Sequence, residues 1–190
     1  MKRYKSSAEL GDAKAQYYLG NCYANGDGVD EDLSEAVKWF KRSAEQGDAD
    51  AQFNLGVCYA KGEGVDKDLS EAAKWFKRSA EQGDAKAQYL LGVCYYNGDG
   101  VTKDLYEAVK WCRKSAEQGN ADAQYNLGVC YYFGDGVKED KNTALYWLKK
   151  AMEHKEYLSG EMINKIESII EELESEGYSD HVQDEQGNGR

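Results

Sequence analysis

The sequence predicts an all-α protein, a solenoid in which antiparallel helix pairs stack one after another. The first indication is the stretch from Ala15 to Gly47, which recurs three more times at a spacing of 36 residues. A constant period of this size is typical of solenoids, in which each repeat buries its apolar face only against its neighbours. The second indication is that the 190-residue chain contains no proline, the residue that most disturbs helix interiors.

Two residue types mark equivalent positions in the repeats. The glycines are Gly20, Gly56, Gly92 and Gly128, and the tryptophans, the only four in the chain, are Trp39, Trp75, Trp111 and Trp147. Glycine leaves room for two helices to approach closely, and a buried tryptophan covers a large area. We therefore expect the glycines where the two helices of a pair meet. The tryptophans are expected to form a hydrophobic ladder rather than a binding site.

The repeats define the domain organisation. Residues 1–11 match the end of a repeat, because KSSAELGD resembles KRSAEQGD at 41–48. We expect an N-terminal half-repeat there that supplies a single helix. The four full repeats are predicted at 12–47, 48–83, 84–119 and 120–155.

Each full repeat is predicted to contain a helix A and a helix B. In the first copy helix A runs from about Ala13 to Asn25, with Asp12 as its N-cap and Gly26 at its C-terminal end. Helix B follows the loop and is opened by Asp32, with a glutamate three residues later, a pair typical of a capping box. It ends near Gln46, before a glycine. The fourth copy has Thr143 in place of that glutamate, so a weaker cap is expected there.

The C-terminal segment differs from the repeats. GEMINKIESIIEELESE, residues 160–176, places six apolar side chains on one face of a helix and charged ones on the rest. We expect residues 156–176 to form a capping helix that covers the last repeat, with a dimerisation or partner helix as the alternative. Residues 177–190 are polar and are predicted to be a disordered acidic tail.

Charge argues against two classes of partner. The net charge is −11, and residues 156–190 hold ten acids and two bases, so the repeats are nearly neutral. The sequence shows no basic stripe that would neutralise phosphates, so nucleic-acid binding is not expected. No run approaches the roughly 20 apolar residues of a membrane span, and the N-terminus lacks an apolar signal region. A cytoplasmic location without membrane association is the expectation, unless the chain is part of a longer secreted one.

The cysteines and histidines offer little chemistry. Cys22, Cys58, Cys94 and Cys130 occur once per repeat at one position, where they are expected to be core residues too far apart for disulfides. Cys112 lies on helix B of the third repeat, and a single disulfide with Cys94 or Cys130 on a neighbouring helix A is the alternative. The only histidines are His154 and His181, and no nucleophile–base set or metal-ligand spacing is present. We therefore expect no catalytic residues, no metal and no cofactor.

The repeat pattern resembles the Sel1-like repeat family, a relative of the tetratricopeptide repeats. The second copy shows it in full, as AQFNLGVCYAKGEGV followed by AAKWFKRSAEQGDA, and the resemblance covers about residues 5–155. It implies a right-handed α-α superhelix with a concave groove for proteins or peptides, and a role as an adaptor or scaffold. A cysteine-rich branch of the family is linked to penicillin binding or β-lactamase-like hydrolysis. That branch carries paired cysteines in each repeat, and this chain lacks the pairing.

Positions that vary between copies indicate where a ligand would bind. By analogy with the tetratricopeptide groove, the residues equivalent to 14, 17, 21, 24 and 25 of helix A should line the concave side. Aromatic residues at these positions become more frequent toward the C-terminal half. The predicted partner-binding residues are the anchors Tyr89, Tyr96, Tyr125, Tyr132 and Phe133, the backbone-binding Asn97, and Lys61 and Lys86 for acidic groups. For the aromatic position equivalent to 17, packing between repeats is an equal alternative.

The function predicted from these observations is a non-enzymatic protein-interaction scaffold that binds a peptide or protein along helix A. One alternative is a hydrolase of the penicillin-binding kind. Another is a purely structural, consensus-like repeat array. A monomer is expected, with dimerisation through the C-terminal helix as the alternative.

Overall fold

The computed structural model describes residues 2–180, and all regular structure in that range is helical. The helices divide between two compact units, Met1–Lys103 and Asp104–Arg190. The first unit contains α1 (Lys2–Glu9), α2 (Ala13–Asn25), α3 (Leu33–Glu45), α4 (Ala49–Lys61), α5 (Leu69–Glu81) and α6 (Ala85–Asn97). The second contains α7 (Leu105–Glu117), α8 (Ala121–Phe133), α9 (Lys141–Met152), the short 3₁₀ helix η1 (Lys155–Tyr157) and α10 (Gly160–Ser175).

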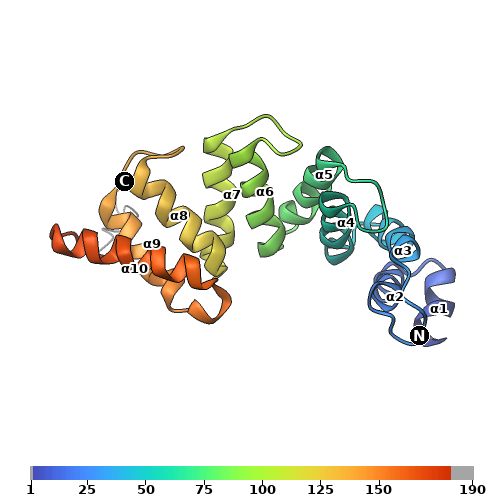
Figure 1. The fold of residues 1–190 in the computed structure, drawn as a ribbon. Helices are drawn as coiled ribbons and strands as arrows, with labels where there is room; N and C mark the ends of the chain where they lie inside the picture. Colours follow the sequence, from blue (N-terminus) through green and yellow to red (C-terminus); the bar gives the residue numbers. More distant parts are fainter. Residues whose placement is uncertain (1, 181–190) are drawn as a thin grey trace, which may run out of the picture. The chain divides into compact units, whose positions relative to one another are not determined.

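The helices alternate between the A and B positions that the repeat predicts (Figure 1). In the first unit α1 packs against α2, α2 pairs with α3, α3 packs against α4, and the same order continues to α6. In the second unit α7 packs against α8, α8 pairs with α9, and α10 packs against α9. The single helix predicted for residues 1–11 is present as α1. Its Ala8 is buried in a core cluster with Leu19 and Trp39.

The helix boundaries follow the predicted caps. The Asp12 carboxylate accepts a hydrogen bond from the Ala15 amide at 2.6 Å, and Gly26 ends α2 with φ +72° and donates its amide to the Cys22 carbonyl. A side chain at that left-handed position would be strained, which explains the glycine. Aspartate or asparagine occupies the equivalent N-cap in every copy, at Asp48, Asp84 and Asn120.

The capping box predicted for helix B forms only in half. Asp32 accepts a hydrogen bond from the Glu35 amide at 2.9 Å, as expected. The Glu35 side chain, however, is hydrogen-bonded by Lys38 instead of reaching back to the cap. The backbone N–H of Asp32 donates to the Tyr23 carbonyl at 2.9 Å. Because this contact already satisfies the N–H, the reciprocal half of the box is not needed.

Gly20, Gly56 and Gly128 each mark a close approach of helix A to helix B. A Cβ atom added at Gly20 would lie 2.6 Å from Cδ1 of Phe40, and one at Gly128 would lie 2.8 Å from the side chain of Leu148. Both distances are far below van der Waals contact, so a larger residue would force the two helices apart. This confirms the steric role predicted for these glycines.

Buried polar side chains join the helices of the first unit. Gln52 Nε2 donates to the Ala44 carbonyl at 3.1 Å, and Gln82 Nε2 donates to Gln52 Oε1 at 2.8 Å. Ser79 Oγ donates to the Ala49 carbonyl at 2.9 Å. These hydrogen bonds satisfy groups that would be costly to bury alone, and they fix how each helix sits on the next.

The tryptophan ladder is incomplete. Trp39, Trp75 and Trp111 are buried, but Trp147 is only half-buried. In the first three copies a cation lies over the ring, for example Arg42 at 4.6 Å from the Trp39 centroid. In the fourth copy the equivalent Lys150 is bonded to Glu153 at 3.0 Å, and Trp147 packs edge-on against Tyr146. The fourth tryptophan therefore departs from the predicted core role.

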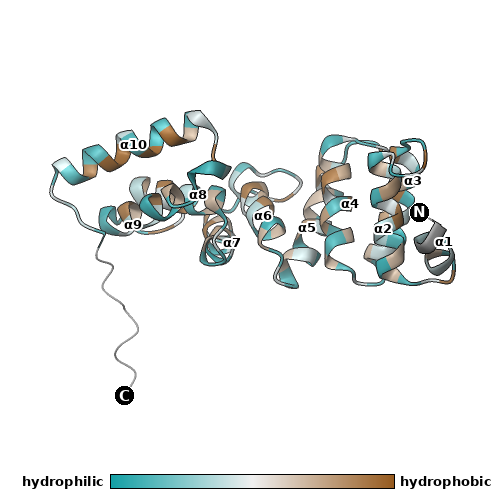
Figure 2. Ribbon diagram, turned by 90° about the horizontal axis from the view of Figure 1, so that it is seen from below, coloured by the Kyte–Doolittle hydropathy of each residue, from teal (hydrophilic) through white to brown (hydrophobic). Residues whose placement is uncertain are grey.

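Helix α10 closes the last repeat in the second unit. Its apolar face buries Ile166 and Leu173 completely, and these side chains lie in two clusters with residues of α8 and α9. Figure 2 shows α10 running beside α9, with teal and brown residues alternating along it. The segment after it returns to α9, where the Ser179 amide donates to Asn142 Oδ1 at 3.1 Å. Residues 181–190 of the predicted acidic tail lie outside the described residues.

Candidate functional site

The candidate surface is the open face of helix A in the first unit. It consists of four rows in which no residue is fully buried: Lys14, Asp50 and Lys86; Tyr18, Asn54 and Leu90; Asn21, Val57 and Val93; Asn25, Lys61 and Asn97. The rows follow a helical spacing of four, three and four residues, so each helix presents them along one side. The neighbouring positions equivalent to 15, 16, 19, 20 and 22 are buried in α2, α4 and α6.

The part of the open face between α2 and α4 is polar. Lys14 Nζ lies 2.6 Å from Asp50 Oδ2 and 3.5 Å from Asp48 Oδ2. The hydrogen bond to Asp50 is the main reason that the pKa of Lys14 is raised. Next to it, Asn54 Nδ2 donates to Asn21 Oδ1 at 3.3 Å. Side chains of adjacent repeats therefore bind each other here.

The part between α4 and α6 is apolar. Val57 is the equivalent of Asn21, and Leu90 is the equivalent of Asn54. Val57 and Leu90 are 33 positions apart, as are the two asparagines that are hydrogen-bonded to each other. Both side chains are half-buried, as is Val93 one turn along α6. Tyr96, 40% exposed, lies at the end of α6 with Lys103 Nζ 5.4 Å from its ring centroid. The side chains of this patch are therefore only partly buried.

The predicted polar residues of this surface are exposed. Asn97 Nδ2 donates to Asp99 Oδ2 at 3.0 Å, and Lys61 Nζ lies 3.5 Å from Glu63 Oε1. Lys86 is exposed on the first turn of α6. All three flank the apolar patch at the ends of α4 and α6.

The aromatic side chain at the position equivalent to 17 packs between helices in the first two repeats. The ring of Tyr17 lies 6.2 Å from Phe40, and the ring of Phe53 lies 6.2 Å from Phe76. Tyr17 also packs against the core cluster that contains Leu55 and other residues of the second repeat. Tyr89 is half-buried at the equivalent place on α6. Packing between repeats, the alternative for this position, describes Tyr17 well.

Tyr18 is the exposed aromatic residue that the sequence reasoning missed. It is 40% exposed, and its ring lies 5.1 Å from Tyr4 and 5.3 Å from Tyr17. The sequence signal is weak, because positions 17 and 18 both lie about one turn from Lys14, whose Nζ is 4.9 Å from the Tyr17 ring centroid and 5.8 Å from that of Tyr18. The predicted increase of aromatic residues toward the C-terminus therefore overlooks an aromatic group at the other end of the first unit.

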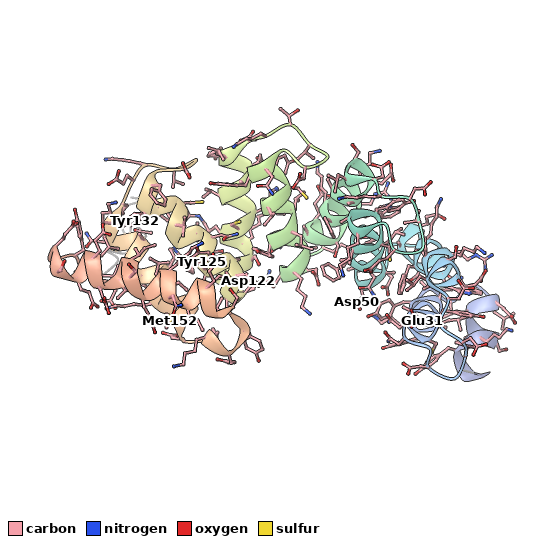
Figure 3. The ribbon with its side chains drawn as sticks, in the orientation of Figure 1. Glu31, Asp50, Asp122, Tyr125, Tyr132 and Met152 are labelled. Atoms are coloured by element: carbon pink, nitrogen blue, oxygen red, sulfur yellow. The ribbon has the colours of Figure 1, made fainter. Side chains whose placement is uncertain are left out.

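In the second unit α10 contacts the aromatic residues of α8. Tyr125 packs against the cluster that contains Ile166, and Figure 3 shows it on the side of α8 next to α10. The Tyr132 hydroxyl donates to Glu172, and this hydrogen bond is the main reason that its pKa is raised to about 12. Lys141 Nζ lies 3.6 Å from the Tyr132 ring centroid and donates to its carbonyl. Both tyrosines thus take part in holding α10.

Phe133 and Asp122 lie at opposite ends of α8. Phe133 is 63% exposed, and its ring stands edge-on to Tyr132 at a centroid distance of 4.8 Å. Asp122 is half-buried on the first turn, and this burial raises the pKa of its carboxyl group. Of the predicted anchors in the second unit, Phe133 is the one whose side chain stays largely in solvent.

The cysteines are buried, free thiols. Burial raises the pKa of Cys58, Cys94 and Cys130 to about 11 and that of Cys112 to about 12. Thiols of this kind are poor nucleophiles at neutral pH, since the thiolate is the reactive form. Within residues 2–180 no group of histidine, cysteine and acidic side chains could hold a metal ion. In the same range, no helix is both long and apolar enough to cross a membrane.

Solved structures show what the chain is similar to. A protective antigen of uropathogenic Escherichia coli strains, which displays an SLR fold, is 44% identical with a TM-score of 0.78, over 80% of this chain and 33% of that one. A Sel1 repeat protein from Oxalobacter formigenes is 33% identical with a TM-score of 0.75, over 88% and 75%. The chain thus spans about a third of the length of the E. coli antigen.

Further comparisons establish the family. Cysteine rich protein B of Helicobacter pylori has a TM-score of 0.54 over 74% of this chain and 99% of that one, but at 21% identity it shows the fold alone. No curated protein matches the chain. The Sel1 repeat model matches residues 13–48, 49–84, 85–120 and 121–154. The chain therefore belongs to the Sel1 repeat family, whose members generally serve as scaffolds for protein–protein interaction.

Proposed function

We propose that this protein is a non-enzymatic scaffold that binds a peptide or protein segment on the open face of helix A in the first unit. The observation that carries the proposal is the apolar patch of Val57 on α4 and Leu90, Val93 and Tyr96 on α6, whose side chains are only partly buried. Apolar and aromatic side chains of this kind form the centre of most protein interfaces.

The polar side chains around the patch favour a partner segment whose backbone or acidic groups lie next to them. Asn97 and Lys61 stand at the ends of α6 and α4, where an amide and an ammonium group can bind a partner's backbone carbonyl or carboxylate. Lys86 offers a second cation at the opposite end of α6. These are the polar residues predicted from the sequence, and the proposal retains them together with Tyr96.

The proposal changes the set of aromatic anchors. Tyr125 and Tyr132 contact α10, so in the second unit their rings are already partly occupied. Tyr89 lies at the position that in the first repeat packs between helices. Tyr18 is added, because it is exposed on the same row as Leu90. Phe133 is kept as an exposed side chain of the second unit and is outside the proposed patch.

The experiment is a pull-down from lysate of the source cells, read by quantitative mass spectrometry. The variant Leu90→Ala/Tyr96→Ala should lose the bound protein, because both changes remove apolar area from the patch. The matched control is Tyr106→Ser, which removes a 69% exposed aromatic side chain elsewhere and restores the residue found in the first two repeats. The control should retain the partner.

The result is interpretable only if the variants stay folded, which circular dichroism and the melting temperature check. Partner loss in both variants, or in neither, would contradict the assignment of the patch. A captured protein should then be mapped on the chain by cross-linking. Cross-links confined to α10 would show that the acidic helix, and not the open face, is the binding surface.

A further inference from the structure

Another surface of the first unit, on helix B, is rich in positively charged side chains. Lysine or arginine recurs at positions 38, 41 and 42 and their equivalents, which lie on one side of a helix because they are three and four residues apart. In the first unit we call this the basic face: Lys38, Lys41, Arg42, Lys74, Lys77 and Arg78, all of them exposed. The nearly neutral charge of the repeats conceals this periodic placement.

The cations of the basic face are not equivalent. Lys38 is hydrogen-bonded to Glu35, and Lys74 lies 2.6 Å from Glu71, so one lysine of each helix already has a carboxylate partner. Lys77 is 3.9 Å from Glu81, at the limit of an ion pair. Among the described residues, Lys41, Arg42 and Arg78 make no ion pair.

The two arginines are held in place by buried tryptophans. The guanidinium carbon of Arg42 lies 4.6 Å from the ring centroid of Trp39, and that of Arg78 lies 4.4 Å from the centroid of Trp75. Stacking on a fixed ring restricts the side chain, so less conformational entropy is lost when the group binds a ligand. Because neither guanidinium group makes an ion pair among the described residues, its N–H groups can donate to a ligand.

We propose that the basic face of the first unit docks an acidic protein segment, with Arg42 and Arg78 each receiving a carboxylate. A guanidinium group matches a carboxylate by two parallel hydrogen bonds, which gives both strength and orientation. The equivalence of the two repeats offers the same group twice, so a segment with two separated acidic side chains can be bound at two points.

Charge complementarity favours discrete carboxylates over a phosphate backbone. Exposed Glu45 and Glu81 lie on the same helices within one turn of Lys41 and Lys77. A nucleic acid carries closely spaced charge along its whole length and would meet these glutamates, whereas an acidic peptide can place its side chains at the arginines alone. The surface is separate from the open face of helix A, so the inference does not depend on the function proposed above.

The experiment uses the full chain and three labelled probes: a hexaglutamate peptide, a hexalysine peptide and a short oligothymidylate. Binding is followed by fluorescence anisotropy at low and at physiological salt. Tryptophan emission of the protein is a second readout, because a carboxylate at Arg42 or Arg78 changes the surroundings of the ring below it. We expect saturable binding of hexaglutamate that weakens with salt, accompanied by a change in tryptophan emission.

Two double variants provide the matched comparison, since each removes two positive charges. Arg42→Gln/Arg78→Gln should weaken hexaglutamate binding by about tenfold, because two preorganised charge-assisted contacts are lost. Lys38→Gln/Lys74→Gln should weaken it by less than about twofold, because those lysines are already neutralised by glutamates. Melting curves establish that both variants are folded, and Arg42→Lys/Arg78→Lys, which keeps the charge, should give an intermediate loss.

Three results would overturn the proposal. The first is equal weakening in both double variants, which would mean that only net charge matters. The second is tighter binding of oligothymidylate than of hexaglutamate, which would assign the surface to phosphates. The third is salt-sensitive self-association, abolished both by the arginine variant and by Glu167→Gln/Glu171→Gln on α10, which would make a second copy of this chain the occupant.

Discussion

Tyr96 on α6 and Tyr132 on α8 occupy equivalent positions in consecutive repeats, yet their surroundings differ. Tyr96 is 40% exposed at the edge of the apolar patch, with a lysine 5.4 Å from its ring. Tyr132 is half-buried, donates a hydrogen bond from its hydroxyl to Glu172 of α10, and has Lys141 at 3.6 Å from its ring. The same residue type thus lies on an open surface in one unit and takes part in holding a terminal helix in the other.

Position in a repeat therefore does not by itself fix a residue's role. What lies against the helix decides whether an aromatic side chain packs internally or stays available to a partner. In the second unit α10 supplies that cover, with Ile166 and Leu173 as its completely buried anchors. For this reason the proposed binding surface is assigned to the first unit.

The largest expected effect comes from removing the anchors of α10. Ile166→Ala and Leu173→Ala should each lower the free energy of unfolding of the second unit by about 2–5 kcal/mol, because each leaves a cavity in a closed core. Urea unfolding followed by circular dichroism measures the loss. Ile169→Ala, at a half-buried position, is the control and should cost less. Losses below about 1 kcal/mol at both anchors would show that α10 does not hold the fold of this unit.

Alkaline pH should weaken both units through their buried thiols. Each unit contains two thiols with a raised pKa, Cys58 and Cys94 in the first and Cys112 and Cys130 in the second. The unfolded thiols lose their protons above their ordinary pKa of 9.0, while the folded ones keep them until about pH 11 or 12. The unfolded state then binds fewer protons, so the free energy of unfolding falls as pH rises above 9.

At pH 10 this loss should be about 1.4 kcal/mol for each thiol, relative to pH 8. Melting temperatures across this range measure it. Cys112→Ala should reduce the pH dependence of the second unit by about half, because Cys130 remains, and should leave that of the first unchanged. An equal slope in the variant and the unmodified chain would mean that other groups, and not the thiol, cause the loss.

The smallest effect distinguishes a tyrosine that contacts α10 from one on the open face. Tyr132→Phe should lower the free energy of unfolding by about 1 kcal/mol, because it removes a hydrogen bond to a carboxylate at a partly solvated site. Tyr18→Phe, at a position that is 40% exposed on α2, should change it by less than about 0.5 kcal/mol. Both are read from urea unfolding curves. Equal effects would remove the distinction between the covered and the open face.

Much of the fold could be predicted from the sequence because its signals are local. The N-cap of α2 at Asp12, the left-handed Gly26 and the close approach at Gly20 all depend on the nearest turns or on the partner helix of the same repeat. These features recur from copy to copy, so each prediction has several independent instances in one chain.

What could not be predicted depends on contacts between distant segments. The amide of Asp32 donates to the carbonyl of Tyr23, a hydrogen bond across the loop, and so the capping box is incomplete. The amphipathic pattern of residues 160–176 predicts a capping helix but gives no indication that Glu172 meets Tyr132. The prediction takes position 17, and not position 18, as part of the binding face by analogy with the tetratricopeptide groove. Tyr18 is missed for that reason.

Tyr18 and Tyr96 on helix A of the first unit are each 40% exposed, whereas Tyr125 and Tyr132 on α8 contact α10, and this contrast underlies the assignment. Hydroxyl-radical footprinting of the intact chain, read by mass spectrometry at single residues, measures it directly. Tyr18 and Tyr96 should be modified several times faster than Tyr125 and Tyr132, because α10 shields the latter pair. Equal rates at all four tyrosines would disprove the contrast, since α10 would then leave the face of α8 as open as that of α6.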